Sequence, residues 1–255
     1  MSSLDATHYL LSLQLLRDKV PSFDAYPFCL ETVRQLERID FHPKVTYIIG
    51  ENGSGKSTLL EALATAYGFN PEGGTRNFNF ATRASHSPLH QYLRLAKSFR
   101  KPRDGFFLRA ESFYNVASNI DELDKDEPGA YKPPSHVRDS YGGKSLHQQS
   151  HGESFFSLIT HRFGGQGLYV LDEPEAALSA ARQMAMLARI HALVQDSSQF
   201  IIATHSPILL AYPDAAIYQI HDGALHLTAY EDCTPFRDTQ HFLNNHQAYL
   251  KRLLS

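Results

Sequence analysis

The sequence predicts an α/β protein with a mostly parallel sheet. Short apolar runs typical of buried strands alternate along the chain with segments of helical spacing. The strands are expected at residues 44–50, 105–110, 167–171 and 200–204, and the helices at residues 58–67 and 179–195. Strands that alternate with helices pack as a parallel sheet covered by those helices. A glycine-rich turn between residues 50 and 58 supports the same architecture.

Other elements are expected around this pattern in the first part of the chain. Residues 9–16 predict an opening strand, and residues 28–40 predict a second strand or a short helix. Residues 89–99 have the spacing of a further helix. Residues 121–145 are polar and contain prolines and glycines, so we expect a loop or insertion there.

The last part of the chain predicts a hairpin and a terminal helix. Asp222 and Gly223 separate two alternating apolar runs within residues 217–227, which is a strong signal for a two-residue hairpin turn. Residues 240–254 are expected to form the helix.

Composition narrows the classes of protein. The 255 residues are 42% hydrophobic, enough for a full core, and the formal net charge of −3 gives no overall attraction to nucleic acid or anionic membrane. No apolar run reaches 18 residues and the N-terminus lacks a signal-peptide pattern, so we expect no transmembrane segment. With only two distant cysteines, a cytoplasmic protein is expected.

A phosphate-binding loop occupies residues 50–57, which fit the pattern G-x-x-x-x-G-K-[ST]. Backbone N–H groups at such a helix start can wrap a phosphate. Lys56 would then reach the β- and γ-phosphates and Ser57 would hold Mg²⁺. A chance match in a glycine-rich loop is the alternative. The predicted nucleotide-binding residues here are Gly50, Glu51, Asn52, Gly53, Ser54, Gly55, Lys56, Ser57 and Thr58.

Polar residues follow two later strands of the predicted sheet. Asp172 and Glu173 come directly after a strand, where Asp172 would bind Mg²⁺ and Glu173 would act as general base toward water. A helix cap before Pro174 is the alternative. His205 ends the next strand and is expected to contact the γ-phosphate, although a lone histidine is more often structural.

A third polar turn precedes an apolar helix. Ser150, His151, Gly152 and Glu153 make a small glycine-containing helix start, which can bind an anion. The same residues fit a capping box with Ser150 as the cap and Glu153 at the third position. The two interpretations are compatible.

In this order the motifs resemble the ABC-type ATPase superfamily, and in detail small bacterial ATPases of the RecF-like kind. Residues 50–57 look like its Walker A motif, residues 150–153 like its signature, and residues 168–173 like its Walker B motif. His205 looks like its switch histidine. The resemblance implies a P-loop NTPase fold with an antiparallel and a helical subdomain, in one domain over residues 1–255 with the helical insertion at about 75–165.

The sequence departs from the family at several points. His151 replaces the first signature glycine, and Ser179 stands where the D-loop usually has aspartate. Glu111, beside Arg109, is the candidate for the Q-loop position and for a metal ligand. The aromatic residue that would stack on adenine is left open among Tyr26, Phe28 and Phe41, all of which fit a core equally well.

The resemblance implies ATP and Mg²⁺ as cofactors and an ATP-dependent homodimer that sandwiches two nucleotides. Ser150 and Gly152 of one copy would face Lys56 of the other, and the ATPase cycle would drive an unidentified protein partner. Two alternatives are the nucleotide-binding subunit of a membrane transporter and a DNA-repair or chromosome ATPase. A nucleic-acid partner is an alternative because residues 94–103 carry five basic side chains and no acid. A solvated helix end explains these side chains as well. A small-molecule kinase would lack the signature turn.

Overall fold

The larger sheet has six strands in the order β5-β6-β7-β3-β8-β9, in a computed structural model that describes residues 8–75, 87–109 and 151–254. Neighbouring strands run parallel from β5 to β8, and β9 is antiparallel. The strands are β5 Asp104–Arg109, β6 Gly167–Asp172, β7 Gln199–Ala203, β3 Val45–Ile49, β8 Ala215–His221 and β9 Ala224–Leu227. The predicted α/β fold with a mostly parallel sheet is confirmed.

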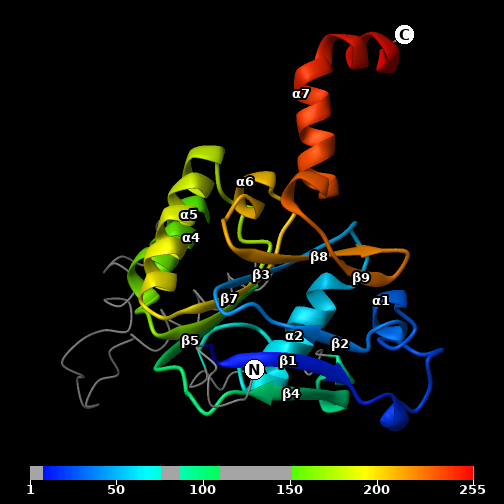
Figure 1. The fold of residues 1–255 in the computed structure, drawn as a ribbon, viewed down its shortest axis with the longest axis vertical. Coiled ribbons are helices and arrows are strands. Elements are labelled where there is room, and N and C mark those ends of the chain that lie inside the picture. Colours follow the sequence, from blue (N-terminus) through cyan, green and yellow to red (C-terminus); the bar gives the residue numbers. More distant parts are fainter. Residues whose placement is uncertain (1–7, 76–86, 110–150, 255) are drawn as a thin grey trace, which may run out of the picture.

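Helices cover both faces of this sheet, so β3, β6 and β7 are buried throughout. Helix α4 (His151–Ser157), a π-helical turn (Leu158–Arg162) and helix α5 (Ala180–Gln195) pack on one face. Helix α2 (Lys56–Tyr67) packs on the other (Figure 1). Because side chains of a strand alternate between faces, Tyr47 joins one core and Ile48 the other. This burial explains the near-continuous apolar runs.

A second, antiparallel sheet of order β2-β1-β4 lies beyond α2. Its strands are β1 (Leu10–Leu15), β2 (Arg38–Asp40) and β4 (Leu93–Lys97). The predicted helix over residues 89–99 is wrong: a 3₁₀ turn at Pro88–Tyr92 leads into β4. Leu93 and Leu95 alternate with exposed residues, and pairing with β1 outweighs the helix propensity of this short segment.

The connections contain further short elements. Residues 28–40 hold both predicted alternatives, the short helix α1 (Glu31–Arg34) and strand β2. A 3₁₀ turn at Arg17–Lys19 follows β1, and α6 (Pro207–Leu210) follows β7. The predicted hairpin is confirmed, since β8 and β9 pair across Asp222 (φ 48°) and Gly223 (φ 79°).

The C-terminal helix begins earlier than expected. After a 3₁₀ turn at Tyr230–Asp232, helix α7 runs over Thr234–Leu253, with non-helical backbone at Asn245. It projects away from the sheets and buries none of its residues (Figure 1). Within the described residues, no helix combines the length and the apolar character needed to cross a membrane. Most of the predicted insertion at 75–165, including the loop at 121–145, lies outside the described residues, and the domain limits stay a prediction.

Gln199, the first residue of β7, joins the two sheets. Its fully buried side-chain amide makes four hydrogen bonds to backbone groups. Its Oε1 accepts from the N–H groups of Tyr9 (3.1 Å) and Leu10 (2.9 Å), and its Nε2 donates to the carbonyls of Leu10 (2.8 Å) and His42 (3.1 Å). Both lone-pair sites and both protons of the amide are therefore used.

Replacing Gln199 with Met should lower the free energy of unfolding by about 3 kcal/mol, because four buried backbone groups lose their partner. The matched control is Gln14→Met, at an exposed position of β1. Urea unfolding followed by circular dichroism measures both variants. Equal stability of Gln199→Met and Gln14→Met would contradict the role of Gln199 in joining the two sheets.

Candidate nucleotide-binding site

The phosphate-binding loop connects β3 to α2, as the sequence predicts. Gly53 (φ 79°) and Gly55 (φ 95°) take left-handed backbone conformations that side chains disfavour. Gly50 has no room for a side chain, since a Cβ would lie 2.9 Å from Ile220 Cβ and from Ser54 Oγ. The loop is also braced from outside, where Thr32 Oγ1 donates to the Ser54 carbonyl at 2.5 Å. Its glycines are therefore needed for its shape.

Lys56 is held inside the curve of this loop. Its ammonium group donates to the carbonyls of Gly50 (2.8 Å) and Glu51 (2.9 Å), and only 4% of the residue is exposed. Burial lowers the pKa of Lys56, although the nearby carboxylates Glu173 and Asp172 act in the opposite direction. A buried cation at a helix start is well suited to an anionic ligand, which would offset its desolvation.

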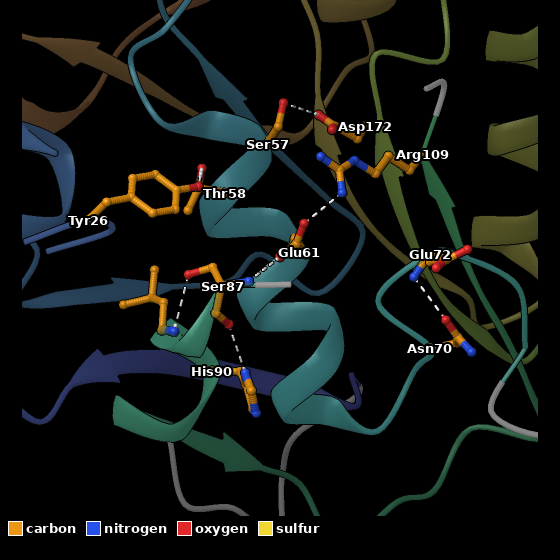
Figure 2. A network of polar contacts seen from close by, with 11 residues as sticks. Tyr26, Ser57, Thr58, Glu61, Asn70, Glu72, Ser87, His90, Arg109 and Asp172 are labelled. Carbon is orange, nitrogen blue, oxygen red and sulfur yellow. Dashed lines mark hydrogen bonds and ion pairs between the residues drawn. The ribbon is translucent and has the colours of Figure 1, made fainter. Parts of the chain in front are cut away.

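Ser57 and Asp172 bring two oxygen atoms together in front of the loop. Ser57 Oγ donates to Asp172 Oδ1 at 3.2 Å, and the aspartate is 5% exposed (Figure 2). Hydroxyl and carboxylate oxygens suit Mg²⁺, which usually takes its other ligands from water and substrate phosphates. Among the described residues no group of three or more His, Cys, Asp or Glu could hold a metal without such additional ligands. Glu111, the third predicted metal ligand, lies outside the described residues.

Glu173 and His205 lie side by side beyond Asp172. Glu173 has a left-handed backbone (φ 50°), and its N–H donates to the carbonyl of Ala203 at 2.9 Å. Its Oε1 lies 3.4 Å from His205 Nε2, and both side chains are more than a third exposed. The two predicted catalytic residues therefore meet at the edge of the sheet, where both side chains are partly exposed although His205 Nε2 itself is buried.

Sequence reasoning missed a second carboxylate in this place. Glu175 Oε1 accepts a hydrogen bond from the backbone N–H of His205 at 2.6 Å. Glu175 Oε2 is buried and has no hydrogen-bond partner among the described residues. The N–H to carboxylate bond fixes the backbone that carries His205. Its position two residues after Glu173 in the sequence was the available signal.

Gly152 and Glu153 lie elsewhere in the same chain. A Cβ on Gly152 would be 2.5 Å from the carbonyl oxygen of Ala177, so this turn packs closely on the segment that follows β6. Glu153 forms an ion pair with Arg182 at 3.6 Å. Ser150 lies outside the described residues. These contacts of Gly152 and Glu153 are thus with Ala177 and Arg182, in the segment that follows β6 and at the start of α5.

The aromatic candidates separate into core and surface residues. Phe28 and Phe41 are 3% and 4% exposed and belong to the core, whereas Tyr26 is 63% exposed. The hydroxyl of Tyr26 lies 3.4 Å from Thr58 Oγ1, near the loop (Figure 2).

A cavity of about 600 Å³ adjoins the other side of the loop. Gly50, Glu51, Ser54 and His205 line it together with the end of β8 and the start of α7. The loop and His205 therefore face open space that a ligand or a second chain can enter.

Comparison with known proteins agrees with this geometry. A family model described as an AAA domain matches residues 26–117. MJ1267, an ATP-binding cassette of an ABC transporter, is 17% identical over 88% of this chain and 93% of its own, with a TM-score of 0.51. CbiO1 from Clostridium perfringens, part of the ABC transporter complex cbiONQ, is 16% identical over 97% of this chain and 99% of its own, with a TM-score of 0.50. No curated protein sequence matches at a significant level.

The loop, its lysine and the carboxylate at the end of β6 define a P-loop nucleotide-binding fold. More particularly, the chain has the fold of the ABC-type ATPase superfamily.

Replacing Lys56 with Ala should remove the stabilisation that ATP gives to the folded protein. A ligand at one hundred times its Kd stabilises the folded state by about 2.7 kcal/mol, which thermal unfolding detects readily. Lys44→Ala, at an exposed lysine paired with Asp214, is the matched control and should keep the ATP-dependent shift. A full shift in Lys56→Ala would contradict the assigned role of this loop.

Proposed function

We propose that the protein is an ATPase that binds ATP with Mg²⁺ and works as an ATP-sandwiched homodimer to drive a partner process. The observation that carries this proposal is the meeting of four groups at one edge of the sheet. Lys56 and Ser57 begin α2 after the loop that follows β3, Asp172 ends β6, and Glu173 and His205 follow the ends of β6 and β7. That arrangement supplies a phosphate cradle, a cation site and a candidate base.

Each group has a role in phosphoryl transfer to water. Lys56 and the N–H groups of the loop would bind the β- and γ-phosphates, and Ser57 with Asp172 would hold Mg²⁺. When bound, Mg²⁺ would neutralise negative charge on the phosphates. Glu173 would orient a water and accept its proton, and His205 would donate a hydrogen bond to the γ-phosphate. The 3.4 Å separation of Glu173 and His205 supports their acting on the same phosphate.

The resemblance of residues 150–153 to the ABC-type signature suggests a second copy of the chain as the partner of this turn. Gly152 and Glu153 pack against Ala177 and Arg182 of their own chain. We infer that Ser150 and Gly152 of one copy complete the site around Lys56 of the other.

We place the protein in the cytoplasm on the strength of its two free cysteines, Cys29 and Cys233. The protein that the ATPase cycle drives is not identified, and a transporter subunit is the alternative that the two cassettes suggest.

Replacing Glu173 with Gln should leave ATP binding intact and lower the rate of hydrolysis about 100-fold or more, the usual worth of a general base. The variant should also trap an ATP-dependent dimer, visible by light scattering. Glu231→Gln, at an exposed position far along the chain, is the control and should hydrolyse ATP like the wild type. Wild-type turnover in Glu173→Gln would refute the proposed mechanism.

A nucleic-acid role is the second candidate, because all five basic residues of the 94–103 segment are exposed. They lie on β4 and the turn after it, so the solvated helix end expected from the sequence is wrong. Lys97 is partly engaged, since its ammonium lies 4.3 Å from the ring centre of Tyr67.

With a net charge of −3, we expect DNA binding by this protein to show no marked dependence on salt. Fluorescence anisotropy with labelled duplex DNA at 50 and 200 mM salt tests this. A loss of affinity on the order of 100-fold would indicate several phosphate contacts. If the double variant Arg100→Glu, Lys101→Glu then lost this salt-dependent binding, the result would favour a nucleic-acid role and contradict our expectation.

A further inference from the structure

Two polar contacts connect helix α2 to the ends of neighbouring strands. Ser57 and Glu61 are four residues apart and therefore share one face of the helix. Ser57 Oγ donates to Asp172 Oδ1 at 3.2 Å, and Arg109 Nη1 donates to Glu61 Oε2 at 2.6 Å. Arg109 and Asp172 are register partners in the parallel strands β5 and β6. The two contacts thus lie next to each other, as Figure 2 shows.

The Glu61–Arg109 pair is largely shielded from water. The side chain of Glu61 is 9% exposed and that of Arg109 is 25% exposed. The other carboxylate oxygen of Glu61 accepts from the backbone N–H of Ser87 at 3.0 Å. Both oxygens of Glu61 are therefore used, and the orientation of its carboxylate is fixed. A buried ion pair of this kind costs stability when one partner is removed, because the other charge is left uncompensated.

Among the described residues, Arg109 lies near the carboxylates of Glu61 and Asp172, which have different roles. Register partners on adjacent parallel strands are about 4.8 Å apart and point to the same face, so a long arginine side chain spans that distance. A guanidinium that paired with Asp172 would place a positive charge where a divalent cation binds. The pair with Glu61 directs this charge toward the helix instead.

We propose that Glu61 is a positioning residue that keeps the Arg109 guanidinium away from Asp172 and so leaves this carboxylate available to the divalent cation. The inference rests on the proposed function, which assigns Asp172 to Mg²⁺. It predicts that Glu61 acts on the cation through Arg109, and that its effect disappears when Arg109 is also neutral.

The experiment titrates Mg²⁺ into the protein with a fluorescent ATP analogue and records the Mg²⁺ concentration at half-maximal nucleotide binding. In Glu61→Gln this midpoint should rise about tenfold, because a guanidinium that has lost the Glu61 carboxylate can compete with the cation for Asp172. In Glu61→Gln with Arg109→Gln it should return to within about twofold of the wild type, as the competitor is gone. Glu37→Gln, at an exposed site, is the control and should not move the midpoint.

Thermal unfolding without metal separates this role from simple support of the fold. Both Glu61 variants should unfold at a lower temperature, but only the single variant should need more Mg²⁺. An unchanged midpoint in Glu61→Gln, or an equally raised midpoint in the double variant, would overturn the inference. If Glu61→Gln does not fold, Glu61→Asp keeps the charge with a shorter reach and should raise the midpoint about threefold; no rise would likewise overturn it. Absence of any Mg²⁺-dependent nucleotide binding in the wild type would instead refute the proposed function.

Discussion

The parallel register of β6, β7 and β3 is the constraint on which the site depends. Asp172 of β6 is the register partner of Ala203 of β7, and Ala203 is the partner of Ile48 of β3. The segments that follow these three positions therefore begin side by side at the same edge of the sheet. The phosphate loop, Glu173 and His205 start from that edge, although more than 150 residues separate the first from the last. A shift of β6 by one residue would turn the side chain of Asp172 to the opposite face of the sheet.

The burial of the central strands confines the charged residues of the site to the strand ends. The fully buried strands leave no exposed position for a charged residue until the strand ends. Charge is then concentrated where backbone groups can compensate it. Lys56 donates hydrogen bonds to two loop carbonyls, and Glu175 accepts a hydrogen bond from the backbone N–H of His205. The site is consequently rigid on the side of the protein and accessible on the side of the cavity.

Much of the fold and of the site could be predicted because the signals are local. The strand, loop and helix at residues 44–67 are contiguous, and so are the strand and carboxylates that end at Glu173. Strand β4 was missed because Leu, Ala, Arg and Lys favour a helix in a short segment, and only pairing with β1 decides otherwise. The Glu61–Arg109 pair joins residues 48 positions apart, a separation that no local pattern encodes.

The bonds of Gln199 also have a mechanical meaning. Its amide is fastened to β1 and to His42, while the other end of β7, only five residues long, leads into the segment that carries His205. A five-residue strand spans about 17 Å and is held by neighbours on both edges. The amide of Gln199 thus ties the smaller sheet to the strand whose other end leads to His205.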